Sequence, residues 1–486
     1  MFTLPLLLLT AQVLATSSRS SPSSRPGRPG HNETSCCTIL SEQLAEKVLL
    51  RGSYNVSTAI EAYYSEQAQT QKPACVVLPS SAEDVSIAVK VLSMGFKIGL
   101  QSCEFAIRSG GHTPWANLNN IDDGATLDLS NLNQVTPNAD GTVVGVGPWN
   151  RWEDVYSVLD PMNLTALGGR SRTIGVGGLV MSAGMSFFSA RYGLPCDNVA
   201  NFEVVLSNGS IVNANAASNS DLHRALKGGS NNFGVVTRLD LNAYDLVSSF
   251  SKYANSEGAD EYAQLQILYG IFGPVIIVMS MQHYPKPEAP PEPVFGAISA
   301  LTTTNTFRIA SQKNFTVEQE SIPDGGTTRR AFSTVTFGNN AEMAQRFVYT
   351  ANATMEGLRD VDGIVFIISF QGLSQLITSK SSQHGGNLLG LDTEGGDRIL
   401  VAVTAAWEAE TDDKMMYTAI QTLMEDTNRE AQNLGVADEF IFMNYASPWQ
   451  DVYGGVGAEN RKEFQRISKL YDPMQLFQKA VPGFKL

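Results

Sequence analysis

Three glycine-rich segments in the first half of the chain restrict its fold more than any other feature. They occupy residues 108–112, 168–184 and 227–234, with the sequences RSGGH, GGRSRTIGVGGLVMSAG and KGGSNNFG. Glycine-rich turns leave backbone N–H groups free to face an anion and let the main chain touch a flat ligand. One such segment is usually a plain tight turn, but three together predict a site for an extended, phosphate-bearing cofactor. Neither a well-formed Rossmann G-x-G-x-x-G nor a P-loop Gly-Lys-Ser/Thr is present.

Length and composition indicate a globular protein with more than one core. A chain of 486 residues exceeds what one hydrophobic core usually serves, so we expect at least two core-bearing lobes. With 43% hydrophobic and 17% charged residues, the chain is too apolar and too sparsely charged to be disordered. A net charge of −14, without any Lys/Arg cluster, argues against nucleic acid as a partner.

Strands and helices alternate up to about residue 245, which indicates an α+β lobe. Ser80 or Ser81 is expected to cap a helix that continues to Leu92. Later, longer strands alternate with polar helices and a Pro-rich loop at 285–293, which predicts an antiparallel sheet covered by helices. The expected strands are 74–78, 105–108, 125–129, 142–147, 275–281, 364–369 and 399–405, and the expected helices include 151–159 and an exposed one at 460–470.

The first 15 residues are typical of a secretory signal peptide, although a basic start is missing, and a buried N-terminal helix is the alternative. Residues 16–35 are Ser/Pro/Arg/Gly-rich and are expected to form a disordered linker. The apolar run 271–281 is too short to span a membrane and is interpreted as one buried strand, so no membrane span is expected. The sequence therefore predicts a secreted or secretory-pathway protein.

Cysteines and glycosylation sequons agree with export. In an oxidising compartment we expect Cys103 to pair with Cys36 or Cys37 and Cys75 with the other, leaving Cys196 as a free thiol. No C-x-x-C and no i,i+4 pair of histidines occurs, so no metal site is expected. N-x-S/T sequons, which would be glycosylated in the secretory pathway, occur at Asn32, Asn55, Asn163, Asn208, Asn314 and Asn352.

His112 is the most informative candidate for chemistry. It ends an expected strand and directly follows two glycines, which leaves its imidazole open towards whatever lies over the loop. An imidazole nitrogen is nucleophilic near neutral pH and is able to attack an electrophilic cofactor carbon. Hydrolase signatures such as G-x-S-x-G and H-E-x-x-H are absent.

Taken together, the motifs resemble those of FAD-linked oxidases of the berberine-bridge-enzyme group, in particular fungal members that act in secondary-metabolite pathways. This group has the vanillyl-alcohol-oxidase/p-cresol-methylhydroxylase fold. The resemblance covers roughly residues 36–245 and 440–480. Its motifs are RSGGHTPW (108–115), TLDLS (126–130), TIGVGG (173–178), YGLPCDNV (192–199), DL (221–222), GGSNNFG (228–234), NY (444–445), YGG (453–455) and YDP (471–473).

The resemblance implies an α+β, two-lobed FAD-binding fold with an antiparallel-sheet substrate domain. The implied boundaries are an FAD-binding domain at 36–247, a substrate domain at 248–435, and a segment at 436–486 that returns to the first domain. It also implies FAD attached through its 8α-methyl group to His112, with backbone groups of residues 108–112 on the pyrophosphate. The implied cofactor-binding residues are His112, Arg108, Ser109, Gly110, Gly111, Ser171, Thr173, Gly175, Gly177, Gly178 and Asn444.

The chain departs from the family pattern at several positions. Ser171 stands where many members have a cysteine bonded to C6 of the flavin, so a single histidyl link is expected. Phe442 replaces a tyrosine that deprotonates substrate hydroxyls, and Leu179 replaces a histidine near flavin N1. Gly169 occupies the position associated with oxygen access to the flavin.

Tyr445 and Trp115 are expected to line the pocket as the catalytic candidates. Trp407 is either a third pocket residue or part of an aromatic core.

These residues predict a flavoprotein oxidase that removes hydride from a small organic substrate and passes the electrons to O₂, giving H₂O₂. One alternative is an oligosaccharide oxidase of the same fold, which Phe442 disfavours. Another is a non-redox isomerase or cyclase that uses FAD as a scaffold, or an oxidation that triggers a spontaneous cyclisation. A third is a non-catalytic binding protein that retains FAD.

Overall fold

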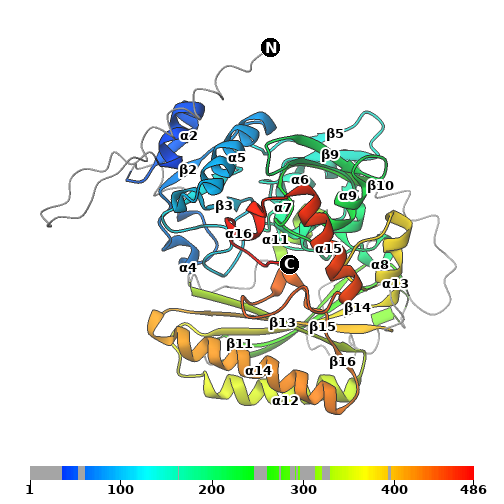
Figure 1. The fold of residues 1–486 in the computed structure, drawn as a ribbon. Coiled ribbons are helices and arrows are strands. Elements are labelled where there is room, and N and C mark those ends of the chain that lie inside the picture. Colours follow the sequence, from blue (N-terminus) through cyan, green and yellow to red (C-terminus); the bar gives the residue numbers. More distant parts are fainter. Residues whose placement is uncertain are drawn as a thin grey trace, which may run out of the picture. The chain divides into compact units, whose positions relative to one another are not determined.

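The described part of the chain contains three sheets and the helices that pack on them (Figure 1). In this computed structural model, the described residues are 35–52, 61–162, 164–245, 260–272, 275–284, 291, 294–295, 312–319, 329–391 and 396–486. The predicted signal peptide, the linker up to residue 34 and most of the Pro-rich loop lie outside them. Residues 35–486 form one compact unit.

The first sheet carries the loop that ends in His112. Its strand order is β1-β2-β4-β3; β2, β4 and β3 are parallel, and β1 is antiparallel to β2. The side-chain oxygen of Ser81 caps helix α5 by accepting from the N–H of Asp84, so the second of the two predicted caps is used. The elements are β1 (Val48–Leu50), β2 (Cys75–Val77), β3 (Phe105–Arg108), β4 (Ala125–Asp128), α2 (Cys36–Leu44) and α5 (Ala82–Lys97).

Two disulfides fasten α2 to β2 and to the turn η2 (Gln101–Cys103) that precedes β3, in one of the two pairings that the sequence left open. Cys36 bonds to Cys103 and Cys37 bonds to Cys75, with Cα–Cα distances of 5.3 and 5.8 Å. Cys196 is a buried free thiol. Burial raises the pKa of this thiol well above its ordinary value, which makes it a poor nucleophile.

The second sheet is antiparallel, and its core includes residues of the helix that forms within the central glycine-rich segment. Its order is β5-β6-β10-β8-β9, and β7 pairs with β10 beside this path. Its core includes Trp152, Phe202 and Leu239. The elements are β5 (Val135–Pro137), β6 (Val143–Val146), β7 (Leu164–Ala166), β8 (Val199–Val205), β9 (Ile211–Asn215), β10 (Val235–Asp245), α6 (Trp152–Leu159), α7 (Val176–Met181) and α9 (Ser220–Leu226).

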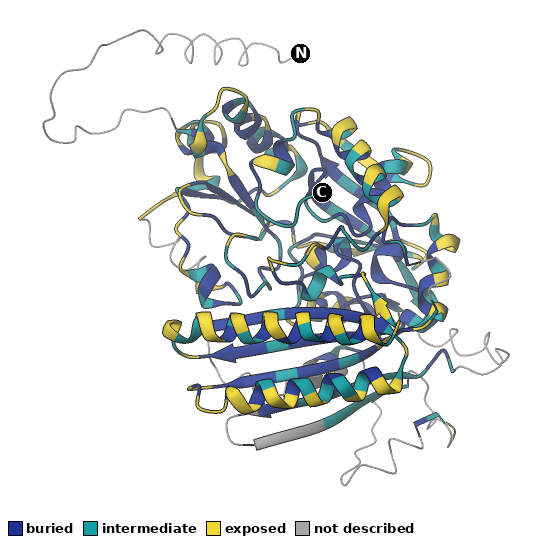
Figure 2. Cartoon of the chain, turned by 60° about the horizontal axis from the view of Figure 1, so that its bottom comes forward, coloured by how far each residue is buried: buried dark blue, intermediate teal, exposed yellow. Residues whose placement is uncertain are grey.

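The third sheet is the predicted antiparallel sheet, with the order β12-β11-β14-β15-β13-β16. Helices α12 and α14 cover one side of it, with their exposed residues turned outward (Figure 2). Its strands alternate: in β14, Phe366 and Ile368 pack in the core, while Ile367 faces the opposite side. The elements are β11 (Gln264–Phe272), β12 (Val275–His283), β13 (Arg329–Gly338), β14 (Val365–Leu373), β15 (Arg398–Trp407), β16 (Ala437–Asp438), α12 (Ala341–Gly357) and α14 (Asp413–Asn433).

The remaining helices are short apart from α15, which matches the helix predicted at 460–470. They are α4 (Glu66–Gln69), α8 (Ser189–Tyr192), α11 (Gln312–Gln319), α13 (Gln375–Thr378), α15 (Ala458–Tyr471) and α16 (Leu476–Lys479). The 3₁₀ turns are η1 (Ala45–Lys47), η2 (Gln101–Cys103), η3 (Asp160–Met162), η4 (Pro195–Asn198), η6 (Ser379–His384), η7 (Glu410–Asp412) and η8 (Met443–Tyr445).

One strand assignment differs from the sequence interpretation. The apolar run 271–281 is not one strand: it contains the end of β11 and most of β12, which pair antiparallel through Ile271 and Ile276. The sequence interpretation gave more weight to the apolar composition of this run than to its Gly-Pro dipeptide, although Gly-Pro is typical of turns. The third sheet is completed by β16, just beyond the predicted boundary at 435. No helix in the described residues is long and apolar enough to cross a membrane.

Candidate functional site

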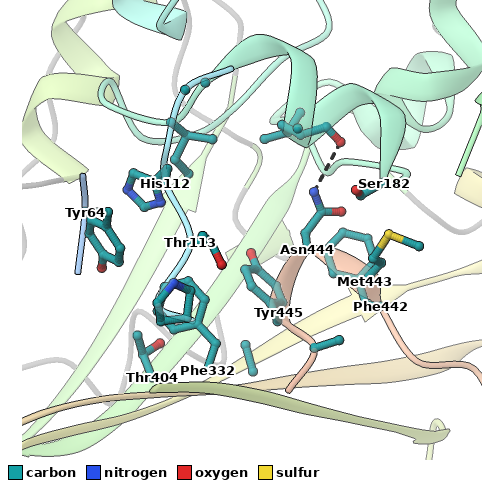
Figure 3. Close-up of a pocket in the computed structure, with 18 of the residues that line it drawn as sticks. Tyr64, His112, Thr113, Ser182, Phe332, Thr404, Phe442, Met443, Asn444 and Tyr445 are labelled. Atoms are coloured by element: carbon teal, nitrogen blue, oxygen red, sulfur yellow. Dashed lines mark hydrogen bonds between the residues drawn. The ribbon is translucent and has the colours of Figure 1, made fainter. Parts of the chain in front are cut away.

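A cavity of about 490 Å³ lies between the glycine-rich loops and the third sheet, on the side that α12 and α14 leave uncovered. Its walls come from the loop after β3, the segment around α7, the turn η8, and alternate residues of the third sheet. Figure 3 shows His112 and Tyr445 projecting into this space from two chain segments that are far apart in sequence. The cavity therefore unites two of the three glycine-rich segments with the second half of the chain, and the third reaches it through Ser230 and Asn231.

Most of the predicted site residues line this cavity. Those that do are Ser109, Gly110, Gly111, His112, Trp115, Ser171, Gly175, Gly178, Asn444 and Tyr445. Arg108, Thr173 and Gly177 are not among its lining residues.

Arg108 supports the loop from behind. Its side chain is 1% exposed, and Nη1 donates to Asp128 Oδ2 at 2.9 Å. The guanidinium lies over the ring of Tyr63, 3.9 Å from the centroid. Burial raises the pKa of the Asp128 carboxyl, and the charge of Arg108 opposes this rise. The Arg108 side chain thus positions residues 109–112, whereas a role on the cofactor would fall to its backbone.

Two glycine-rich loops touch through their backbones. A Cβ atom on Gly110 would lie 2.5 Å from Cα of Gly175, and a Cβ on Gly175 would lie equally close to Cα of Gly110. Gly111 has a φ of +65°, a conformation that other residues rarely adopt. Glycine is therefore needed at these positions for the loops to approach one another.

Gly178 differs from these packing glycines. A Cβ atom built on it would meet no atom within 4 Å, and the residue lines the cavity. The first turn of α7 therefore presents bare backbone to open space. A flat ring system is the kind of ligand that such a surface accepts, so the residues present fit a flavin.

His112 presents its imidazole to the same cavity. The ring stacks on Tyr64, with centroids 3.9 Å apart and an interplanar angle of 18°. Arg330 holds Tyr64 in turn: Nη1 donates to the phenol oxygen at 2.9 Å, and the guanidinium lies 4.1 Å from the ring centroid. The imidazole is thus fixed by a stack of side chains from two other parts of the chain.

The residues that depart from the family pattern also line the cavity: Ser171, Leu179 and Phe442. Phe442 is 2% exposed, and its ring centroid lies 5.1 Å from that of Tyr445. Asn444 fixes this segment against α7, because its amide nitrogen donates to the carbonyl of Leu179 at 3.2 Å (Figure 3). Its amide oxygen also accepts from the N–H of Gly184 at 3.1 Å.

Of the two predicted tryptophans, one lines the cavity and the other does not. Trp115 lines the cavity and packs against Tyr417 and Trp449. Trp407 is fully buried, and its indole N–H donates to Asp413 at 2.9 Å. Trp407 therefore belongs to the aromatic core rather than to the pocket.

Gly169 does not line the cavity. A Cβ atom there would lie 2.5 Å from Cδ1 of Trp152, and its carbonyl accepts from Tyr156 at 3.0 Å. Packing against Trp152 explains the need for glycine at this position. The role of Gly169 in oxygen access stays a prediction.

Sequence reasoning missed the polar residues that the third sheet and Arg170 contribute. Arg170 Nη2 donates to Gln371 Oε1 and, at 3.1 Å, to the phenol oxygen of Tyr445. Gln371 and Gln266 both donate to Ser369. Alternation of polar and apolar residues within β14 was the available signal, but strands of many folds share it. Among the described residues, no cluster of His, Cys, Asp and Glu suited to a metal ion occurs.

Comparison with known proteins places these features in a family. A family model described as an FAD binding domain matches residues 73–215. A protein named FAD-dependent monooxygenase drtC, from Aspergillus calidoustus, is 32% identical to this chain over 96% of the chain and 93% of its own length.

Solved structures share the fold at low sequence identity. Xylooligosaccharide oxidase from Myceliophthora thermophila C1 superposes with a TM-score of 0.71 at 18% identity, covering 93% of this chain and 99% of the oxidase. Berberine bridge enzyme from Eschscholzia californica superposes with a TM-score of 0.69 at 16% identity, with the same two coverages. The chain is therefore an FAD-linked oxidoreductase that belongs to the same family as the Aspergillus protein, and it has the vanillyl-alcohol-oxidase/p-cresol-methylhydroxylase fold that its motifs predicted and that berberine bridge enzyme shares.

Proposed function

We propose that this protein is an FAD-dependent oxidase of a small organic substrate, of the kind found in fungal secondary metabolism. The substrate loses a hydride and a proton, and O₂ takes up two electrons and two protons to become H₂O₂. The observation that carries the proposal is that His112, the open backbone of Gly178 and the third sheet all line one cavity. Such a cavity is able to hold a cofactor and a substrate against each other.

His112 is the proposed point of covalent attachment for FAD, through the 8α-methyl group of its ring. The stack on Tyr64 supports this role, because it fixes the imidazole that must meet one carbon atom. Ser171 offers no thiolate for a second bond, so a single link is proposed. When bound, FAD supplies a two-electron acceptor. The backbone of residues 108–112, and Ser171, Thr173, Gly175, Gly177, Gly178 and Asn444, are the proposed cofactor-binding residues.

Tyr445 is the proposed residue that orients the substrate. Its phenol oxygen accepts a hydrogen bond from Arg170, which leaves the phenol O–H free to be shared with a polar atom of the substrate. Phe442 has no hydroxyl and contributes only apolar surface. Trp115, held by two neighbouring aromatic rings, forms a rigid wall of the same cavity.

The covalent bond and the redox role are tested on the purified protein. Acid-precipitated protein should keep a yellow flavin, and substrates should bleach the oxidised flavin band in the absence of air. On admission of air, one molecule of H₂O₂ should form for each O₂ consumed. Flavin that washes out on denaturation would contradict the link to His112. Turnover without bleaching would favour the non-redox alternative.

Monooxygenation is the second candidate, because the Aspergillus relative is named a monooxygenase. In that reaction one oxygen atom enters the product and the other becomes water, which requires two further electrons from a reductant. Turnover in ¹⁸O₂ decides between the two. Label in the product with little H₂O₂ would establish monooxygenation, whereas unlabelled product and stoichiometric H₂O₂ would establish the oxidase.

The oligosaccharide-oxidase alternative takes support from the fold of the Myceliophthora enzyme. Phe442 disfavours it, since a phenol is missing where that mechanism needs a base. Rapid H₂O₂ production with cello-, xylo- or malto-oligosaccharides would establish it.

Passage through the secretory pathway is proposed as well. The two disulfides support it, because such bonds form in oxidising compartments. Of the six sequon asparagines, Asn208, Asn314 and Asn352 lie in the described residues, and all three are exposed. A fall in apparent mass after treatment with an endoglycosidase, together with recovery of the protein from the culture medium, would support secretion. Protein without glycan that stays in the cytosol would contradict it.

A further inference from the structure

Arg170 extends from the central glycine-rich segment into the cavity. Its Nη2 donates both to Gln371 Oε1 on the third sheet and to the phenol oxygen of Tyr445. Its Nη1 is buried and has no hydrogen-bond partner within the described part of the chain. One side of the guanidinium is thus fixed by the protein, while the other nitrogen keeps its donor capacity for a ligand.

The cavity has a positive charge balance in a protein whose net charge is −14. Its lining residues include Arg170 and Arg330 but no aspartate or glutamate. Arg330 is occupied by Tyr64, through a hydrogen bond and a cation–π contact. A buried guanidinium nitrogen without a partner is costly, and an anionic oxygen is the ligand that offsets this cost best.

The surroundings of Arg170 are pre-organised. Gln371 also donates through Nε2 to Ser369, at 3.3 Å, and this bond orients its carbonyl oxygen towards Arg170. Ser369 in turn accepts from Gln266 on the neighbouring strand. The guanidinium therefore meets a fixed row of side chains on the sheet, so little ordering is required when a ligand binds.

The rest of the sheet wall is largely apolar. The apolar residues of β11 to β15 that line the cavity are Leu268, Met281, Phe332, Val365, Ile367, Ala402, Ala405 and Ala406. A ligand that fills this space would combine an anionic oxygen at one end with an apolar body.

We propose that Arg170 binds an anionic oxygen of the substrate, so that the substrate class is an apolar organic acid with a carboxylate or an acidic phenol or enol. This assignment deepens the proposed function, because it concerns the substrate of the same site. It separates the protein from oxidases of neutral sugars and of amines.

The test measures binding rather than turnover. Holoprotein is titrated with benzoate, 1-naphthoate and biphenyl-4-carboxylate, and in parallel with the neutral carboxamide of each. Calorimetry and the shift of the flavin absorption band report binding. We expect at least one carboxylate to bind about tenfold or more tightly than its carboxamide. In Arg170→Gln, carboxylate binding should weaken by about tenfold or more, while carboxamide binding should stay within about twofold.

Arg172→Gln is the matched control. Arg172 is two residues away, pairs with Glu153 and is not among the residues that line the cavity. The Arg172→Gln variant should bind every carboxylate and carboxamide probe with the affinity of wild type. Arg170→Lys keeps the charge without the planar fork and should give an intermediate loss. The thermal midpoint and the flavin content of each variant show whether it is folded and loaded.

Several results would overturn the assignment. Wild-type protein that binds no probe, or binds acids and amides alike, contradicts it. Equal losses of carboxylate affinity in Arg170→Gln and Arg172→Gln would also contradict it. An altered flavin spectrum and sulfite affinity in Arg170→Gln, with the acid preference intact, would show that Arg170 serves the cofactor instead. Failure of the proposed function would appear separately, as normal acid binding by a protein that forms no H₂O₂.

Discussion

The two walls of the cavity are built in opposite ways. The loop wall depends on backbone: Gly110 and Gly175 touch through their main chains, and Gly178 offers bare backbone to open space. The sheet wall depends on side chains, which alternate between the cavity and the core along each strand. A surface made of main-chain atoms suits a ligand that is always the same, such as a cofactor. A surface made of side chains can change in shape and polarity when residues are substituted. The difference indicates that the loops determine the cofactor and the sheet determines the substrate.

Loss of the His112 imidazole should have the largest effect of any single change. His112→Ala should abolish covalent flavin completely, because no other lining residue of the loop wall is proposed to attach it. The measurement is flavin absorbance in acid-precipitated protein. His384→Ala, a change outside the cavity-lining set, should retain full covalent flavin. Covalent flavin in His112→Ala would contradict the proposal that the loop wall attaches the cofactor through His112.

Two glycine substitutions should sharpen the comparison within the loop wall. Gly110→Ala forces a Cβ to within 2.5 Å of backbone, so we expect a loss of about 1–3 kcal/mol or more in unfolding free energy, with poor flavin loading. Gly178→Ala meets no protein atom, so the thermal midpoint of flavin-free protein should not change. Its flavin loading should fall, because the methyl group enters the space proposed for the ring. Normal loading in Gly178→Ala would place the ring elsewhere.

The same contrast explains what the sequence made predictable. Glycines that must approach one another, and a histidine that follows them, are specific residue types at fixed spacings. They identified His112 and most of the loop wall, and the cysteines in an oxidising context limited the disulfides to two pairings, of which the structure has one. Three strands of the first sheet and the helix-covered third sheet were also predicted from apolar patterns, whereas β6 was the one strand of the second sheet among those expected.

The sheet wall was not predictable for a physical reason. Whether a polar residue in a strand faces solvent or a cavity depends on strand pairing, which periodicity alone does not give. Gln266 meets Ser369 only because β11 pairs with β14, where Ser369 also binds Gln371 of its own strand. Arg170 stood inside a glycine-rich segment, but its partners lie on β14 and in η8. Conversely, a position within a motif does not guarantee a place in the cavity wall: Arg108 and Thr173 lie in motifs but do not line the cavity.

Neighbouring isoleucines on β14 offer a matched test of the sheet wall. Ile367 lines the cavity, whereas Ile368 is fully buried in the core beneath it. Ile367→Ala should change KM for the substrate by several-fold and leave flavin content unaltered. Ile368→Ala should cost about 2–5 kcal/mol of unfolding free energy, with KM nearly constant. Chemical denaturation and steady-state kinetics measure the two effects. Equal effects of both changes on KM would show that the sheet transmits strain between its two sides.

The smallest expected effect on the cavity itself comes from acid, which tests whether the stability of the scaffold behind the loop wall depends on pH. His223 is 5% exposed, and its Nε2 lies 2.8 Å from the carbonyl of Val199. Burial, with a contribution from the nearby charge of Lys227, lowers its pKa to about 4. The unfolded chain, with an ordinary histidine pKa of about 6.5, therefore binds a proton between pH 6.5 and 4 that the folded state does not. Stability should fall as pH falls through this window, by up to about 3 kcal/mol from this residue.

His223→Gln should flatten that part of the stability profile, because glutamine does not titrate and keeps a donor for the Val199 carbonyl. Urea denaturation at pH 7, 6, 5 and 4 measures the difference between variant and wild type. The difference in unfolding free energy between wild type and variant should shrink as the pH falls towards 4, because only wild type loses the contribution of His223. Parallel profiles would mean that the unfolded state gains no proton at His223, and that the acid response of the second sheet arises from other groups.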